Sequence, residues 1–308
     1  MSFNSDIYYG SLVKGDLHGA ISYLKQCPEQ VTRYQCFIDL FANEQYLTYD
    51  VDTVLNDVLL AYQQYYRETF YLRIGKELTA NKLKERLIAL LEISDNRIEL
   101  YDLEQCILVE LFLQHGLHFL GGKTSGYYGP YVWRSTETAS YEVELPDGVY
   151  NCTLKLLDGF IMRSWLDYLS FSEIGTGGWA DDEGYISCVK SAWDFESESF
   201  RVSFLKHETQ HARDLKINKE MSSEDLEYRA KLVELIYSSE RNLLRGFIQE
   251  ANDFDKSNGH SLAAHRIMKA FTEFFGEDMI NSYCISMEQI QRFARKLFVD
   301  SNAYLKNK

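Results

Sequence analysis

Apolar residues recur at helical spacing through most of the first 118 residues. They lie three or four positions apart in the ranges 52–73 and 80–93, which predicts two amphipathic helices. The range 103–119 is apolar enough to be a helix buried in a core. Residues 1–118 are therefore expected to form a mainly helical N-terminal region.

The pattern changes at Gly121, where glycines and aromatic residues become frequent. Apolar and polar residues then alternate over 141–145 and 150–156, on either side of a Pro-Asp-Gly turn at 146–148. Such alternation is typical of strands with one buried face. Helical spacing returns further along the chain. This order predicts an α+β fold, with a small antiparallel or mixed sheet followed by helices in a second domain over 119–308.

One His-Glu-x-x-His string occupies positions 207–211. Apolar neighbours at helical spacing predict that it lies on a helix packed into a core; they are Phe204, Leu205, Ala212 and Leu215. On a helix, His207 and His211 project from one face about one turn apart, so both imidazoles can hold one metal ion. Glu208 is then placed to act on a water held by that metal. The pattern favours a metal centre over a solvated helix that carries the string by chance.

A catalytic zinc ion generally has three protein ligands, so a third ligand is needed. A second helix is expected to begin after Ser222, as its N-cap, and to continue to about residue 252. Glu227 lies at the margin of the apolar stripe of that helix, which consists of Leu226, Ala230, Val233 and Tyr237. Glu227 is the preferred third ligand. The alternatives are Glu224, Asp214 and Glu234.

These two segments together resemble the gluzincin branch of the zincin-like metallopeptidases. In that branch His-Glu-x-x-His is followed by a second helix with a glutamate ligand, often a few residues before an alanine. The run Glu-Tyr-Arg-Ala at 227–230 matches this second pattern, and the resemblance covers about 207–235. There are two departures. Fifteen residues separate His211 from Glu227, fewer than in the best-known members, and Arg213 stands where a hydrophobic residue is usual.

The resemblance implies a zincin-like catalytic half in which His207, His211 and Glu227 hold Zn²⁺ and Glu208 is the general base. It also implies an activity, the hydrolysis of an amide bond in a peptide or protein substrate. A non-catalytic zincin relative that serves binding or regulation is the alternative, and a structural metal site is a third class. A structural site would not need Glu208, which favours catalysis.

Further roles around the metal stay open at this level. Asp214 follows His211 by three residues and is either a hydrogen-bond partner of a metal-bound imidazole or a surface residue paired with Arg213 or Lys216. Four residues compete, unranked, for the group that stabilises an oxyanion: His260, His265, Tyr228 and Tyr237.

The glycine-rich stretch at 175–179 lacks the lysine and spacing of a phosphate-binding loop, so it is expected to shape a loop or strand edge before a possible strand at 184–189. It is also a candidate for the edge strand that binds peptide substrates in zincins.

The run Gly-Asp-Leu-His-Gly at 15–19 resembles a fragment of the metallophosphoesterase signature, but the further block of that family is absent. His115 and His118 are expected to be core or helix-end residues.

Composition excludes some partners. The chain of 308 residues has a net charge of −14, which argues against nucleic acid or an anionic membrane as the main partner. No apolar run is long enough for a membrane span, and the polar N-terminus does not resemble a signal peptide. The six scattered cysteines are expected to be reduced thiols, and the protein to be cytoplasmic.

Overall fold

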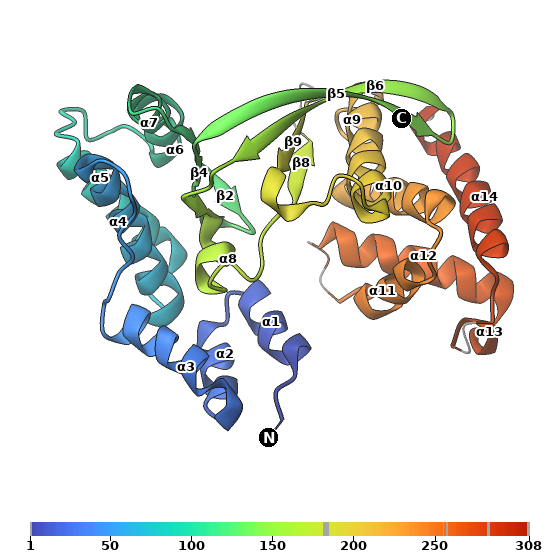
Figure 1. The fold of residues 1–308 in the computed structure, drawn as a ribbon, viewed down its shortest axis with the longest axis horizontal. Helices are drawn as coiled ribbons and strands as arrows, with labels where there is room; N and C mark the ends of the chain where they lie inside the picture. The colour runs from blue at the N-terminus through green and yellow to red at the C-terminus, as the bar shows by residue number, and fades with distance from the viewer. Residues whose placement is uncertain (1, 181–184, 255, 257, 282–283, 307–308) are drawn as a thin grey trace. The chain divides into compact units, whose positions relative to one another are not determined.

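The chain forms two compact units, in a computed structural model that describes residues 2–180, 185–254, 256, 258–281 and 284–306. Unit 1 comprises Met1–Ser135 and Asp158–Gly175, and unit 2 comprises Thr136–Leu157 and Thr176–Lys308. Both combine helices with small sheets, so the fold is α+β (Figure 1). The helical region expected at 1–118 lies within unit 1, which extends further along the chain because later strands pair there.

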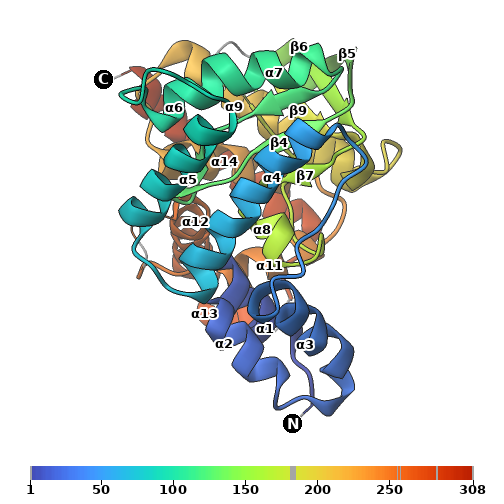
Figure 2. The same cartoon turned by 90° about the vertical axis from the view of Figure 1, so that its left-hand side faces the viewer.

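Unit 1 consists mainly of helices (Figure 2). They are α1 (Ser5–Val13), α2 (Leu17–Leu24), α3 (Val31–Phe37), α4 (Thr53–Tyr66), α5 (Lys76–Leu90), α6 (Leu100–Asp102), α7 (Val109–Gln114) and α8 (Ser164–Leu169). The helices expected at 52–73 and 80–93 correspond to α4, with the π-helical turn that continues it to Tyr71, and to α5. Aromatic side chains fill the core; Tyr62, Tyr66 and Trp165 are almost fully buried.

The helix expected at 103–119 is shorter than predicted. A π-helical segment, Leu103–Leu108, leads into α7, which ends at Gln114. Gly116 follows in the left-handed region at φ 74°, and the amide of Leu117 donates to the carbonyl of Phe112. This glycine-dependent C-terminal cap stops the helix. The residues beyond it form β1 by pairing with β4. The prediction extended the helix too far because periodicity alone does not distinguish a buried strand from a buried helix.

Unit 1 has two small sheets. In the first, β4 (Tyr131–Trp133) lies between β1 (His118–Leu120) and β7 (Met162–Arg163), and both pairings are antiparallel. In the second, β2 (Lys123–Thr124) pairs with β3 (Tyr127–Tyr128). The pairing of β7 with β4 brings residues after 158 into unit 1.

Unit 2 has one mixed sheet of four strands in the order β5-β6-β9-β8. The long strands β5 (Ser135–Leu145) and β6 (Gly148–Asp158) are joined by the predicted turn. β9 (Ile186–Val189) runs parallel to β6, and β8 (Gly178–Ala180) pairs antiparallel with β9 at the edge of the sheet. The strand expected at 184–189 therefore exists as β9, whereas Gly184 lies outside the described residues.

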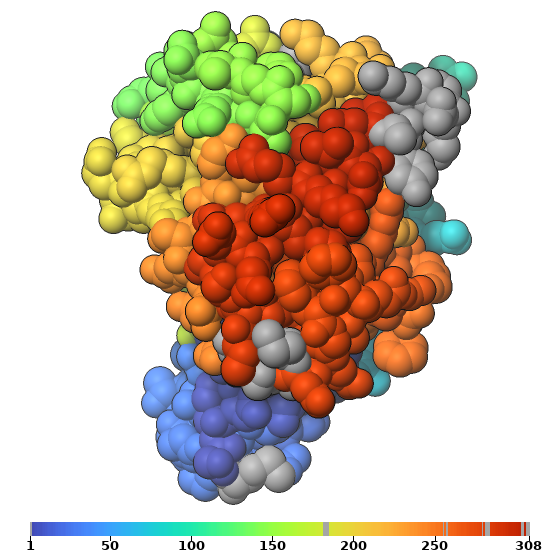
Figure 3. All heavy atoms as spheres, turned by 90° about the vertical axis from the view of Figure 1, so that its right-hand side faces the viewer, coloured from blue at the N-terminus to red at the C-terminus, as the bar shows by residue number. Residues whose placement is uncertain are grey.

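The described part of unit 2 has six α-helices: α9 (His207–Ile217), α10 (Ser223–Tyr237), α11 (Asn242–Glu250), α12 (Gly259–Phe275), α13 (Glu277–Asn281) and α14 (Met287–Lys306). Their apolar faces form a second core. Figure 3 shows the face of unit 2 on which α14, in dark red, lies beside orange helices. Across the described residues, no helix combines the length and apolar character that a membrane span requires. Cys27, Cys36, Cys106, Cys152 and Cys188 are free thiols.

The single helix expected from Ser222 to about residue 252 is divided in two. Ser222 caps α10 as predicted, accepting from the amide of Asp225. The helix ends at Tyr237, however, because Ser238 is extended and its hydroxyl donates to Glu198. Serine side chains that bond outside the helix compete with helical hydrogen bonds.

Candidate metal centre

The His-Glu-x-x-His string begins α9, directly after a π-helical segment, Ser199–Lys206. Phe200, Phe204 and Leu205 of that segment are buried, so the helix is packed into the core as its apolar neighbours predict. His207 and His211 are themselves buried at 7% and 9% exposure. Their Nε2 atoms face each other at 2.9 Å. π-Helical turns are frequent at functional sites, and this one ends directly before the first histidine.

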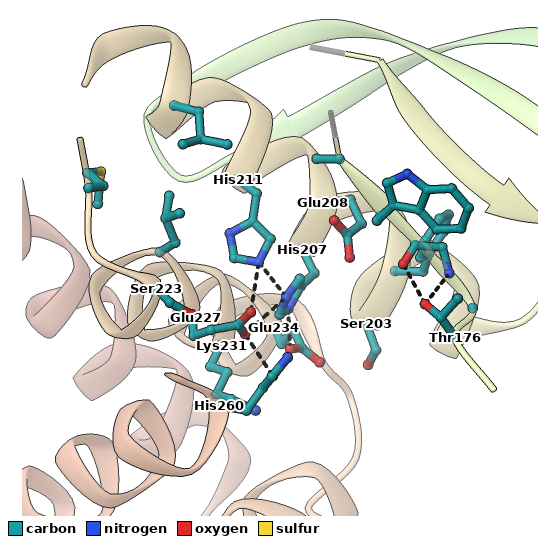
Figure 4. A pocket seen from close by; sticks show the side chains of 18 of the residues that line it. Thr176, Ser203, His207, Glu208, His211, Ser223, Glu227, Lys231, Glu234 and His260 are labelled. Carbon is teal, nitrogen blue, oxygen red and sulfur yellow. Dashed lines mark hydrogen bonds and ion pairs between the residues drawn. The ribbon is translucent and has the colours of Figure 1, made fainter. Parts of the chain in front are cut away.

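Glu227 of α10 lies against both imidazoles. Its Oε2 is 3.5 Å from Nε2 of His207, and its Oε1 is 3.4 Å from Nε2 of His211. The three side chains are the one group of potential metal ligands found among the described residues, with ligand atoms within 4.8 Å of one another (Figure 4). The structure thus brings together the three residues that the sequence proposes as ligands.

The spacing of these atoms fits a zinc ion. Zn–N and Zn–O distances of about 2.0–2.1 Å in a tetrahedral arrangement place ligand atoms about 3.3 Å apart. The two imidazole nitrogens lie 2.9 Å apart, and the nitrogens of His207 and His211 lie 3.5 and 3.4 Å from different oxygens of Glu227, so the separations bracket that value. Two imidazoles and one carboxylate are also a common zinc donor set.

The electrostatics of the cluster favour positive charge. Burial by itself would lower the pKa of His207, but the carboxylates of Glu234 and Glu227 reverse that effect and raise it to about 10. Burial would raise the pKa of Glu227, yet hydrogen bonds from the surrounding histidines hold it well below its usual range. The carboxylates of Glu227 and Glu234 therefore stabilise a cation at His207, either a proton or a metal ion that takes the place of that proton.

Glu234 accepts from Nδ1 of His207 at 2.7 Å. This contact holds a proton on Nδ1, so that a metal replacing the proton on Nε2 would meet the Nε2 lone pair, as in the carboxylate–histidine pairs of known zinc sites. Glu234 is thus not one of the three clustered side chains but supports one of them. It follows Glu227 by seven residues on α10, and helical spacing could have revealed that both share one face.

The two other alternative ligands lie outside the cluster. Asp214 is fully buried, and it accepts from Arg213 and Arg229, not from a histidine. Its interpretation as an imidazole partner or as a surface residue is wrong, although the predicted pairing with Arg213 exists. Glu224 is half-exposed and lies 3.7 Å from Arg266.

Glu208 faces a cavity of about 700 Å³ that also contains the three clustered side chains. Its carboxylate forms no hydrogen bond or ion pair with the part of the chain that the structure describes, and Figure 4 shows it beside His207. The cavity walls are partly aromatic and partly aliphatic; they include Trp179, Trp193, Phe204, Leu215 and Leu226. An unpaired carboxylate next to the cluster is free to accept a proton from a bound molecule.

The glycine-rich stretch borders the same cavity, since Thr176 to Ala180 line it. Gly178 and Trp179 belong to β8, so the expected loop or strand edge is present. A side chain at position 178 is excluded because a Cβ there would lie 2.2 Å from the carbonyl oxygen of Ser187. Glycine at position 178 therefore allows β8 to pair closely with β9. In this position β8 borders the cavity.

Of the four oxyanion candidates, His260 alone lines this cavity. Its Nδ1 is 2.9 Å from Oε2 of Glu227, and 58% of its side chain is exposed. Tyr228 is buried beneath the guanidinium of Arg266, and Tyr237 lies under the ammonium of Lys206.

The other histidine-containing motifs have structural roles. Asp16 caps α2 and pairs with Arg73, while His18 bonds to the carbonyl of Tyr71. His115 pairs with Asp52 after α7, and His118 stacks on Trp133 within the first sheet. They form no second cluster of metal-ligand type among the residues described.

Comparisons of the chain with family models, with curated proteins and with solved structures found no match. The functional assignment therefore depends on the residues of the site.

Proposed function

We propose that unit 2 is a zinc-dependent hydrolase that cleaves an amide bond in a peptide or protein. The observation that carries the proposal is the position of the unpaired Glu208 carboxylate, in one cavity with the cluster of His207, His211 and Glu227. A purely structural metal site has no use for the half-buried, unpaired carboxylate of Glu208, whereas hydrolysis requires a general base.

His207, His211 and Glu227 would hold the zinc ion, and Glu234 would fix the orientation of His207 through Nδ1. Bound zinc lowers the pKa of a water ligand towards about 7 and polarises a carbonyl group. Three protein ligands leave a coordination position for that chemistry, which supports a catalytic site over a closed structural one.

Glu208 would accept a proton from the attacking water on its carboxylate and then give that proton to the leaving amine nitrogen. His260 is placed to donate a hydrogen bond to the substrate carbonyl oxygen as negative charge develops there, because it lines the cavity beside Glu227. Glu208 would thus serve both proton transfers of amide hydrolysis, and His260 would stabilise the charge on the carbonyl oxygen.

The fold around the site supports a zincin-like catalytic half. β8 lies at the edge of a mixed sheet and borders the cavity beside α9. An exposed strand edge can bind an extended peptide through backbone hydrogen bonds. A peptide or protein is therefore the proposed substrate.

Glu208→Gln tests the proposal. Glu208 is not a proposed ligand, so the variant should retain about one zinc per chain by elemental analysis while its rate on a peptide mixture falls at least on the order of a hundredfold. Glu220→Gln, an exposed site beyond α9, is the matched control and should keep full activity. Undiminished chelator-sensitive activity in Glu208→Gln would refute the mechanism. Bound zinc without activity on any peptide would favour a binding or regulatory protein instead.

A further inference from the structure

We infer that the buried ion pair between Asp214 and Arg229 is a positioning device for the metal centre. It fixes the register of α9 against α10 and so holds the two histidines opposite Glu227. The inference rests on the zinc centre of the proposed function, but it concerns two residues that touch neither the metal cluster nor the cavity.

The pair is deeply buried and has defined geometry. Asp214 is 0% and Arg229 2% exposed. One oxygen of Asp214 accepts from Nε of Arg229 at 2.6 Å, and the other accepts from Nη1 of Arg213 at 2.9 Å. Nη1 of Arg229 donates to Ser301 at 2.6 Å and to Asn302 at 3.0 Å, both on α14.

The same chain of contacts continues to the sheet. Arg213 donates to the hydroxyl of Tyr150 at 2.9 Å and pairs with Asp147, in the turn between β5 and β6. The network thus joins the β5–β6 hairpin, α9, α10 and α14. It explains why an arginine stands at position 213, where the gluzincin pattern has a hydrophobic residue.

The ion pair between Asp214 and Arg229 lies close to the proposed ligands along both helices. Asp214 follows His211 by three residues, about 4.5 Å along α9, and Arg229 follows Glu227 by two, about 3 Å along α10. The ligand cluster and the ion pair are therefore two separate points of contact between the same two helices. Two helices held by one contact can still rotate about it, and a second fixed contact restricts that rotation. A metal site needs its ligands placed to within about 0.5 Å.

Stability alone does not account for the pair. Replacing a buried ion pair by apolar side chains is often neutral or stabilising, because removing two charges from water costs much of what their attraction gains. Arg229 adds a further cost, since its Nη2 is buried without a hydrogen-bond partner among the described residues. A costly pair with strict geometry at this position fits a positioning role.

The double variant Asp214→Leu, Arg229→Met tests the inference, because it removes both charges and keeps apolar bulk. We expect zinc affinity, measured by competition with a chromophoric chelator, to fall at least tenfold. The absorption spectrum of the cobalt-substituted protein should also change, while the apoprotein unfolds within a few degrees of wild type. The control, Asp225→Asn with Arg266→Gln, removes a 2.9 Å ion pair between α10 and α12. It should leave zinc affinity and the cobalt spectrum unchanged.

Arg229→Lys is the second variant, should the double variant fail to fold. It keeps the charge but cannot reach Asp214, Ser301 and Asn302 together, so a several-fold loss of zinc affinity is expected. Wild-type affinity and an unchanged cobalt spectrum in the folded variants would overturn the positioning role alone. If the wild-type protein binds zinc no more tightly than His207→Ala does, the proposed metal centre and the proposed function are also contradicted.

Discussion

Three glutamates of one cavity have different surroundings and therefore different proposed tasks. Glu227 is held ionised by the histidines around it, Glu234 accepts from the far nitrogen of His207, and Glu208 has no polar partner among the described residues. Residue type alone does not separate a ligand from a supporting group or a base. The partner of each carboxylate does.

Ligand identity can be tested at this scale with Glu227→Ala and Glu224→Ala. The first opens the proposed coordination shell, whereas the second removes a half-exposed residue outside it. We expect Glu227→Ala to lose its zinc during dialysis and Glu224→Ala to keep about one ion per chain, by elemental analysis. Equal retention in both variants would show that Glu227 is not a ligand.

Glu104 in unit 1 predicts a pH dependence. Burial raises its pKa to about 7, against the opposing hydrogen bonds from Tyr62 and Gly122. A carboxyl group whose pKa is raised on folding costs no stability below about pH 4.5, and the cost grows as pH rises to about 7. Between these values it reaches roughly 3 kcal/mol at most.

Glu104→Gln cannot ionise, so the stability of the variant relative to wild type should improve from pH 5 to pH 7.5. Urea midpoints of unit 1 at both pH values measure this change. A constant difference between the two proteins would mean that Glu104 ionises as freely in the folded chain as in the unfolded one.

At the scale of elements, the edge strand β8 depends on one glycine. Gly178→Ala places a Cβ 2.2 Å from the carbonyl oxygen of Ser187, in backbone that cannot move without separating β8 from β9. We expect a loss of about 1–3 kcal/mol from the free energy of unfolding of unit 2, measured in urea.

The matched control is Gly246→Ala in α11, where a Cβ meets nothing within 4 Å. Alanine is the better helix former, so this variant should gain about 0.5–1 kcal/mol. Similar effects of the two substitutions would argue against the close approach at position 178.

At the scale of the whole molecule, each unit has its own hydrophobic core, and the candidate metal centre belongs to unit 2 alone. Zinc that binds only the folded form of unit 2 stabilises that unit by about 2.7 kcal/mol at a free concentration a hundred times its Kd. Calorimetry of the apoprotein should show one unfolding transition that rises by several degrees with zinc and another that does not move. A chelator should reverse the shift, and His207→Ala should abolish it. If zinc shifts the unfolding temperature of neither transition, the proposed metal centre is contradicted.

The sequence by itself determined the features that depend on short-range spacing. The pair of histidines one turn apart, the N-cap at Ser222, the hairpin around 146–148 and the helices α4 and α5 all follow from local periodicity and local hydrogen bonding. The candidate ligands were named on the same basis, since helical spacing places Glu227 at the margin of a buried face.

Tertiary structure decided what depends on contacts between distant segments. Helix ends at Gln114 and Tyr237 were set by a left-handed glycine and by serines that bond to Glu198, which periodicity does not register. The assignment of residues 158–175 to unit 1 follows from strand pairing. Asp214 and Glu234 were interchangeable as carboxylates in the sequence. Only the fold placed one against Arg229 and the other against His207, because a carboxylate takes its role from the donor that reaches it.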